Sequence, residues 1–321
     1  MSSLDIHLFF SKFSNTYIFG EVKLMSFIIG IILMILGGLI ILGGLQRIAA
    51  FAEKIVPFMA LAYVIGALVI FVLHIDKLGM MFAIIFKSAF GIKAVGGGVT
   101  GVAIKTVMTQ GCKRGVFSNE AGLGSSVMVH SSSNVIEPVK QGMWGIFEVF
   151  ADTIVVCTMT AVVVLSSGKI DLTTGLAIKG TNDATLVADA FANVFGPFGK
   201  YFVAIAMLMF AFTTVLGWSH YGSKAVEYLL GLKATKVYRV IFVLTIVLGS
   251  ILTSSIAWDI SDTFNGLMMI PNLIGVLALS PVVSKITKNY VNRKIKGKDE
   301  EPVLSYDPEI QRAQALKVAR G

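Results

Sequence analysis

Long apolar stretches, separated by short charged connections, run through almost the whole sequence. Several of them approach the roughly 20 residues that a helix needs to cross the hydrocarbon core of a bilayer. Hydrophobic residues make up 55% of the 321-residue chain and charged residues only 14%, with a mean hydropathy of +0.80. A soluble domain needs a polar surface, which this composition does not supply. The sequence therefore predicts an all-α polytopic membrane protein.

Seven membrane-crossing units are expected, together with two amphipathic segments at the membrane interface. The units are Ser26–Leu45, Val56–Ile75, Ala94–Ser133, Pro138–Ser166, Gly199–Gly222, Tyr238–Ser254 and Ser261–Val283. The interfacial segments are Asp76–Lys93 and Asp183–Val194. A polar loop is expected from Gly168 to Asn182. The polar tail after Lys298 need not pack against anything.

The basic residues predict the orientation of the chain. Six of them crowd together after the last apolar unit: Lys285, Lys288, Arg293, Lys294, Lys296 and Lys298. Cytoplasmic flanks of membrane helices carry an excess of lysine and arginine. We therefore expect a multi-pass protein of the plasma membrane with a cytoplasmic C-terminus, and the net charge of +8 does not indicate nucleic-acid binding. By the same rule, the connections at Arg47 to Lys54 and at Lys224 to Arg239 are cytoplasmic, and Met1 lies outside.

Cysteine and histidine residues give no sign of a metal site. Cys112 and Cys157 both fall in apolar segments and are expected to be buried thiols rather than a disulfide. His130 and His220 have no neighbours with metal-ligand spacing.

The stretch KRGVFSNEAGLGSS, Lys113–Ser126, places charge and glycine in the middle of the third unit. One straight helix over Ala94–Ser133 would measure about 60 Å, whereas the hydrocarbon core is about 30 Å thick. The glycines Gly115, Gly122 and Gly124 favour a break instead. The alternative is a solvated cytoplasmic loop between two short helices, but each flanking half would be too short to cross.

An interrupted helix at membrane depth is typical of a transporter binding site. Non-helical backbone is tolerated there only where it lines a cavity or site, and half-helix ends face the ligand. We predict that Phe117–Gly122 is unwound. A helix restarting near Ala121 would point its positive end into the bilayer, which suits a carboxylate.

Several motifs give the chain a family resemblance. They are LGGLQRIAAFAEKIVPFMALAY, RGVFSNEAGLGSS, PVKQG, EVFADTIVVCTMTAVVVL, FAFTTVLGWSHYG, EYLLG, YRVIF, NGLMMIPNLIGVLALSPVV and KITKNY. From roughly Ser26 to Tyr290 the sequence resembles the alanine or glycine:cation symporter family, the sodium:alanine symporters. FSNEAGxG followed by VFxDT is a specific combination. One departure is SSVMVHSSS, where the family has SAPxAHA.

The resemblance implies a partial LeuT-like fold of inverted five-helix repeats. Residues 1–25 would be an N-terminal segment, 26–93 the last two helices of the first repeat with an interfacial helix, 94–285 the complete second repeat, and 286–321 a basic and polar tail. Family members are longer at the N-terminus, so the chain is expected to be N-terminally truncated and to lack the first broken helix.

Candidate substrate-binding residues lie in the predicted break. The free backbone groups of Phe117, Ser118, Asn119, Glu120, Ala121, Gly122 and Gly124 would bind the carboxylate and ammonium of an amino acid. Glu120 at membrane depth needs a partner, and Arg114 is near enough in sequence. That pair either holds the bend open or leaves Glu120 to contact the ligand.

Further candidates lie on other helices. The resemblance implies that Thr213 and Thr214 supply hydroxyl oxygens to a sodium ion; alternatively, both bond to carbonyls of their own helix. Trp218 would wall a small pocket or be an interface aromatic.

The remaining intramembrane polar residues have less specific expectations. Glu148 and Asp152 are candidate cation relays, or partners of lysines such as Lys105, with a structural role favoured for Asp152. Asn265 and Asn272 share a helix face and are expected to join helices.

The leading function is symport of a small neutral amino acid, alanine or glycine, coupled to sodium or a proton. It needs no enzyme chemistry and no cofactor, only sodium as the coupling ion and a lipid bilayer. The alternative is a non-transporting truncated or split-gene fragment, which would need a complementing N-terminal fragment. An intramembrane hydrolase would need a nucleophile–base pair, and Ser118 with Glu120 is a weak one.

Overall fold

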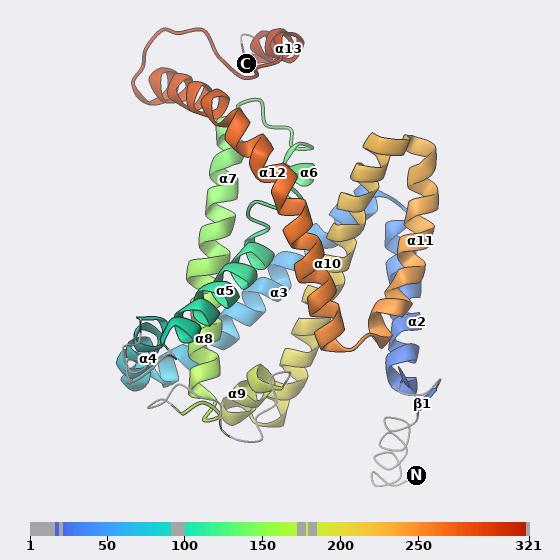
Figure 1. Cartoon of the computed structure of the whole chain (residues 1–321), viewed down its shortest axis with the longest axis vertical. Coiled ribbons are helices and arrows are strands. Elements are labelled where there is room, and N and C mark those ends of the chain that lie inside the picture. The colour runs from blue at the N-terminus through green and yellow to red at the C-terminus, as the bar shows by residue number, and fades with distance from the viewer. Residues whose placement is uncertain (1–16, 19–21, 91–99, 172–177, 179–184, 319–321) are drawn as a thin grey trace. The chain divides into compact units, whose positions relative to one another are not determined.

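The computed structural model describes residues 17–18, 22–90, 100–171, 178 and 185–318 (Figure 1). Within these residues, six helices are long and apolar enough to cross a membrane: Leu24–Ile41, Leu45–Leu73, Pro138–Ser166, Pro197–Leu230, Leu232–Ile251 and Ser255–Ile295. Their apolar side chains face outward, and Phe58 and Ile146 are 68% and 71% exposed. These helices confirm the prediction of a multi-pass helical membrane protein. Ala94–Ser133 is not among the six and lies partly outside the described residues.

The chain divides into two compact units, each formed by two separate stretches of sequence. Unit 1 comprises Met1–Ile85 and Met159–Ser261, and unit 2 comprises Phe86–Thr158 and Asp262–Gly321. Unit 1 contains β1 (Tyr17–Ile18), β2 (Val22–Lys23), α2 (Leu24–Ile41), α3 (Leu45–Leu73), the 3₁₀ turn η1 (Ile75–Lys77), most of α4 (Leu78–Phe90), most of α8 (Cys157–Ser166), α9 (Leu186–Phe195), α10 (Pro197–Leu230), α11 (Leu232–Ile251) and the start of α12 (Ser254–Tyr290). Strands β1 and β2 pair antiparallel, with Tyr17 opposite Lys23.

Two apolar clusters hold unit 1 together. One joins α3, α8, α9 and α10 around Phe191, whose ring stacks on Phe202 at 5.5 Å between centroids. The other joins α2, α3, α10 and α11 through Ile41, Ile48, Leu216 and Val243. Figure 1 shows α2 and α11 running side by side, in agreement with their contacts.

Two predicted connections in unit 1 are helical instead. Gln46–Lys54, expected as a loop, is the first part of α3, and Gly44 with φ 78° makes the turn before it. The Lys224–Arg239 loop is reduced to a turn at Gly231 between α10 and α11. Gln46–Lys54 contains no glycine or proline, and Gly231 is the only such residue in the second stretch. The charged residues in both stretches are good helix formers. Charged residues therefore did not mark the start of α3, the end of α10 or the start of α11.

Unit 2 contains the end of α4, α5 (Thr100–Asn119), α6 (Val127–His130), α7 (Pro138–Phe150), the π-helical turn η3 (Ala151–Val156), most of α12, the π-helical turn η4 (Val291–Ile295) and α13 (Pro308–Val318). Helices α7 and α8 join through η3, and the predicted boundaries Pro138–Ser166 are confirmed. The predicted interfacial segment Asp76–Lys93 contains α4, and Asp183–Val194 covers α9 except for its last residue, Phe195. Lys93, Asp183 and most of the predicted Gly168–Asn182 loop lie outside the described residues.

Two expectations about unit 2 are wrong. The tail after Lys298 packs: Leu304 is 2% exposed and α13 follows it. Cys112 and Cys157 are free but exposed, not buried, so their thiols lie on the helix faces that point outward.

Candidate substrate and cation site

The predicted break lies at Glu120–Ser126, between α5 and α6. Helix α5 ends at Asn119, and the next residues with left-handed backbone are Glu120 (φ 51°), Gly122 (φ 81°) and Gly124 (φ 79°). Among the described residues, Glu120 is the only one other than glycine with positive φ. That conformation costs a side-chain-bearing residue about 1–2 kcal/mol. Surrounding contacts must therefore hold the turn in place.

The break starts later and ends differently than the sequence predicts. Phe117, Ser118 and Asn119 are still helical, so only Glu120, Ala121 and Gly122 of the predicted stretch are unwound. The helix does not restart near Ala121: α6 begins at Val127 and lasts four residues. Successive glycines with positive φ explain this, because they cannot begin a right-handed helix without changing conformation. The expected half-helix pointing at a carboxylate is therefore not formed.

Contacts inside unit 2 fix the break. The Ser125 hydroxyl, fully buried, donates to Glu120 Oε2 at 2.8 Å. The Asn272 side chain on α12 donates from Nδ2 to the Gly122 carbonyl at 2.9 Å. A Cβ at Gly124 would come within 2.6 Å of Asn272 Oδ1, so the backbone approaches α12 closely here. Asn272 was predicted to join two helices; instead it joins α12 to the unwound segment.

The structure gives Arg114 a different partner from the expected one. Its Nη2 lies 2.7 Å from Asp262 Oδ2 and 3.0 Å from Asp262 Oδ1, and Lys113 Nζ lies 3.4 Å from Asp262 Oδ2. The expected pairing with Glu120 rested on closeness in sequence. Asp262 is 148 residues away, and only the folded unit brings it to Arg114.

Asp152 joins α7 to the end of α5. It lies in the π-helical turn η3, and Ser118 Oγ donates to its Oδ2 at 2.5 Å. Next to this contact, Thr153 Oγ1 donates to Asn119 Oδ1 at 3.0 Å. The extra residue of a π-helical turn changes the direction of side chains along a helix, and such turns are frequent at functional sites. Here the turn places Asp152 and Thr153 against consecutive residues of α5.

Glu148 lies one turn before Asp152 and meets a histidine. His130 Nε2 is 3.4 Å from Glu148 Oε2, and His130 Nδ1 is 2.7 Å from Gln141 Nε2. Side-chain positions are described for neither Lys105 nor its neighbours, so that suggested pairing lies outside the described side chains. No cluster of three or more metal-ligating residues occurs among the residues that the structure describes.

Thr213, Thr214 and Trp218 lie on α10 in unit 1. Thr213 Oγ1 donates to the carbonyls of Met209 and Phe210, both at 3.0 Å, and Thr214 Oγ1 donates to Phe210 at 2.9 Å. Both hydroxyls therefore bond to their own helix, which was the alternative expectation for them.

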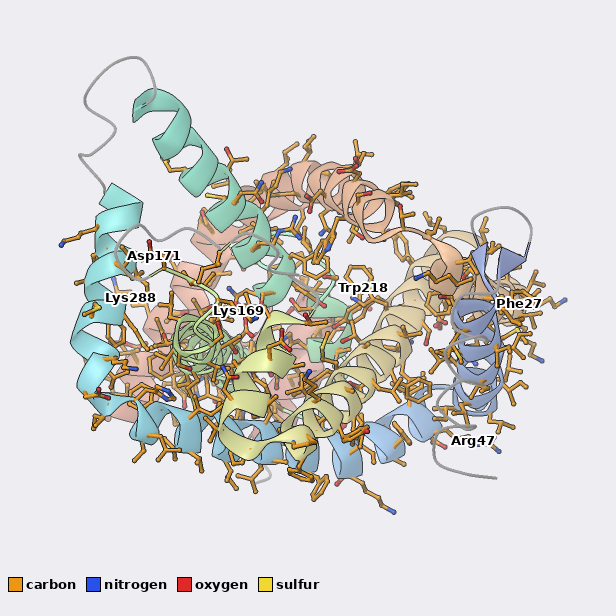
Figure 2. All side chains as sticks on the ribbon, turned by 90° about the horizontal axis from the view of Figure 1, so that it is seen from below. Phe27, Arg47, Lys169, Asp171, Trp218 and Lys288 are labelled. Atoms are coloured by element: carbon orange, nitrogen blue, oxygen red, sulfur yellow. The ribbon has the colours of Figure 1, made fainter. Side chains whose placement is uncertain are left out.

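Trp218, labelled in Figure 2, follows one turn after Thr214 on α10. Its ring meets the ring of Tyr221 edge-on, at 5.5 Å between centroids. The predicted site residues therefore fall into two groups, one in each unit. Unit 2 brings together Arg114, Phe117–Gly122, Gly124 and Asp152, while unit 1 carries the α10 residues. The sequence did not predict a role for Ser125, Thr153 or Asp262. Of these three, only Asp262 was recognisable as a candidate, because it is an acidic residue within an apolar helix.

A multi-pass helical chain with a glycine-containing break beside apolar helices belongs to the class of membrane proteins with discontinuous helices. A model of the sodium:alanine symporter family matches residues 7–304. The chain belongs to this family, which confirms the resemblance seen in its motifs.

Named relatives cover most of the chain. A sodium/alanine symporter of Methanococcus maripaludis is 42% identical over 82% of this chain and 56% of its own length. A probable sodium/glutamine symporter of Bacillus subtilis is 38% identical over 87% of the chain and 56% of its own length. A sodium/proton-dependent alanine carrier of Bacillus sp. is 34% identical over 94% and 68%. The chain thus spans little more than half the length of most of these relatives.

Proposed function

We propose that the chain takes part in symport of a small neutral amino acid, with alanine and glycine as first candidates, coupled to sodium or to protons. The family match and the names of the relatives support this function. The observation that carries it is the break at Glu120–Ser126, because unwound backbone in an otherwise apolar helical protein supplies polar groups to a ligand.

The unwound segment suits an amino acid's two charges. A free N–H group at a helix interruption binds a carboxylate, and a free C=O group binds an ammonium. The Glu120 carboxylate is oriented by Ser125 and adds a negative charge for the ammonium. Phe117, Ser118 and Asn119 take part as the last turn of α5, whose carbonyls carry partial negative charge.

The two threonines on α10 are proposed as sodium ligands. Each hydroxyl gives its hydrogen to a helix carbonyl, and its oxygen keeps lone pairs for a hard cation. Trp218, one turn further on, would limit the size of the substrate.

Asp152 is proposed as a structural or coupling residue, in line with its bond to Ser118. Arg114 is proposed as structural through Asp262. We further propose that the protein lies in the plasma membrane with its C-terminus in the cytoplasm, because exposed lysines follow α12.

Exchange of the coupling ion tests the function and distinguishes its two cations. Uptake of labelled alanine into vesicles that contain the protein is driven first by a sodium gradient and then by a proton gradient alone. We expect accumulation with one gradient, and competition by unlabelled glycine. Uptake that is independent of both gradients would contradict symport, and competition by glutamine but not glycine would contradict the substrate assignment.

A further inference from the structure

Helix α12 and the turn after it contact the broken segment in three places: before, inside and after the break. Before the break, Asp262 pairs with Lys113 and Arg114. Inside it, Asn272 holds the Gly122 carbonyl. All three contacts lie in unit 2, and the third comes from Arg293.

The three contacts have a common direction. Positions 114, 122 and 137 of the segment meet positions 262, 272 and 293 in the same order, so the two stretches run parallel. At 1.5 Å per residue, the stretch from Asp262 to Arg293 is about 46 Å long. The segment from Lys113 to Glu137 is thus held at three points spread along α12 and the turn after it, rather than at a single point.

The middle contact acts on the backbone. Asn272 donates to the carbonyl of Gly122, a residue in a left-handed conformation, and its oxygen lies beside Gly124. The glycines of this turn have no side chains to limit their φ and ψ angles. A hydrogen bond from a neighbouring helix supplies that restriction.

The last contact is a buried ion pair. Arg293 Nη1 and Nη2 each donate to Glu137 at 3.0 Å, and both side chains are 8% exposed. Such paired geometry fixes orientation as well as distance. Glu137 is the residue immediately before α7, so this contact fixes the end of the broken segment.

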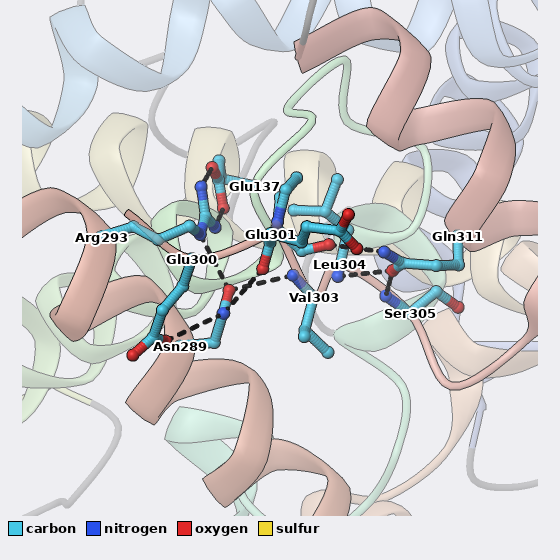
Figure 3. Close-up of polar contacts among 10 residues, drawn as sticks. Glu137, Asn289, Arg293, Glu300, Glu301, Val303, Leu304, Ser305 and Gln311 are labelled. Carbon is cyan, nitrogen blue, oxygen red and sulfur yellow. Dashed lines mark hydrogen bonds and ion pairs between the residues drawn. The ribbon is translucent and has the colours of Figure 1, made fainter. Parts of the chain in front are cut away.

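The C-terminal tail closes over this ion pair (Figure 3). Arg293 Nε donates to Asn289 Oδ1 at 2.8 Å, and the same oxygen accepts the Val303 N–H at 2.9 Å. Asn289 Nδ2 donates to the Glu301 carbonyl at 2.8 Å. Gln311 Oε1 accepts the N–H groups of Leu304 and Ser305. The tail therefore acts on Arg293 through Asn289, which bonds to both.

We propose that Asp262, Asn272 and Arg293 are positioning residues that make α12 and the segment 113–137 one rigid body. The break then keeps its unwound conformation because α12 holds it, and the segment moves with α12. The consequence for substrate binding rests on the proposed function, whereas the rigid attachment does not.

Hydrogen exchange of the purified full chain, followed by mass spectrometry, tests the attachment without any transport measurement. In Asn272→Ala, amides of residues 120–126 should exchange about tenfold faster, the size typical of a lost interaction between contacting groups. The matched control is Asn265→Ala on the same helix, because no hydrogen bond of the Asn265 side chain occurs among the described residues. Exchange in α10, in the other unit, reports that the variants remain folded.

The ion pair supplies a second test. Glu137→Gln, Arg293→Gln and the double variant should all speed exchange at residues 120–126, and the double variant should be no faster than either single one. An effect limited to the tail and the start of α7, or equal exchange in N272A and N265A, would overturn the proposal. If the wild-type protein shows no sodium-dependent binding of alanine but the variants still show these differences in exchange, only the proposed function is contradicted.

Discussion

At the scale of single residues, the conformation of the break depends on two glycines and on polar partners from distant parts of unit 2. Gly122 and Gly124 predicted the break because few other residues adopt positive φ without cost. The sequence could not show that Glu120 shares that conformation, or that Ser125 and Asp262 supply the hydrogen bonds and charge. Tertiary packing determines those partners, whereas the sequence alone pointed to the nearest opposite charge, Glu120 for Arg114.

Two glycines of the same motif should respond in opposite directions to alanine. Gly124→Ala places a Cβ at φ 79° and 2.6 Å from Asn272 Oδ1, so we expect a loss of about 1–3 kcal/mol in stability. Gly115→Ala lies inside α5 with open space around it and should gain about 0.5–1 kcal/mol. Thermal unfolding in detergent measures both, and shifts of the same sign would contradict the structure of the break.

The α10 hydroxyls can be tested against a threonine in the same hydrogen-bonded state. Thr213→Ala and Thr214→Ala should each raise the half-saturating sodium concentration about tenfold, equivalent to about 1.4 kcal/mol per lost ligand. Thr245→Ala on α11, whose hydroxyl bonds to the Phe242 carbonyl, should leave it unchanged. Equal effects from all three substitutions in sodium-dependent uptake would show that only helix back-bonding was lost.

At the scale of elements, hydropathy found the membrane helices but not their ends. Pro138–Ser166 matched the structure because proline begins the helix and a polar loop follows. Helices α3, α10 and α12 extend beyond their apolar centres, since charged residues continue a helix as well as apolar ones do. The packing of the tail was not predicted because Leu304, the one leucine known to be buried among the tail's described side chains, gives no periodic signal.

The tail should lose its packing when Leu304 is shortened. Leu304→Ala removes a side chain that is 2% exposed and should cost about 2–4 kcal/mol. Ile310→Ala, at a position 49% exposed, should cost under about 1 kcal/mol. Trypsin cleavage at Lys298 would report the difference as faster release of the C-terminal fragment. Equal cleavage rates in the two variants would show that the tail does not depend on Leu304.

At the scale of the whole molecule, the candidate residues divide between two units. The broken segment lies in unit 2 and the α10 threonines in unit 1. The LeuT-like repeat arrangement remains a prediction from the family resemblance. In symport, sodium and alanine stabilise the same state of the protein, so each should raise the affinity for the other. Saturating alanine should therefore lower the half-saturating sodium concentration, and saturating sodium should lower the dissociation constant of alanine by the same factor.

The most direct test of the account is sodium-driven accumulation of labelled alanine in vesicles that contain the protein. With an inward sodium gradient, alanine should rise inside above the external concentration and fall back when an ionophore dissipates the gradient. The gradient should have much less effect in Gly124→Val, because a β-branched side chain cannot follow the backbone of the break beside Asn272. Alanine that only equilibrates, with or without sodium and to the same extent in both proteins, would contradict the account.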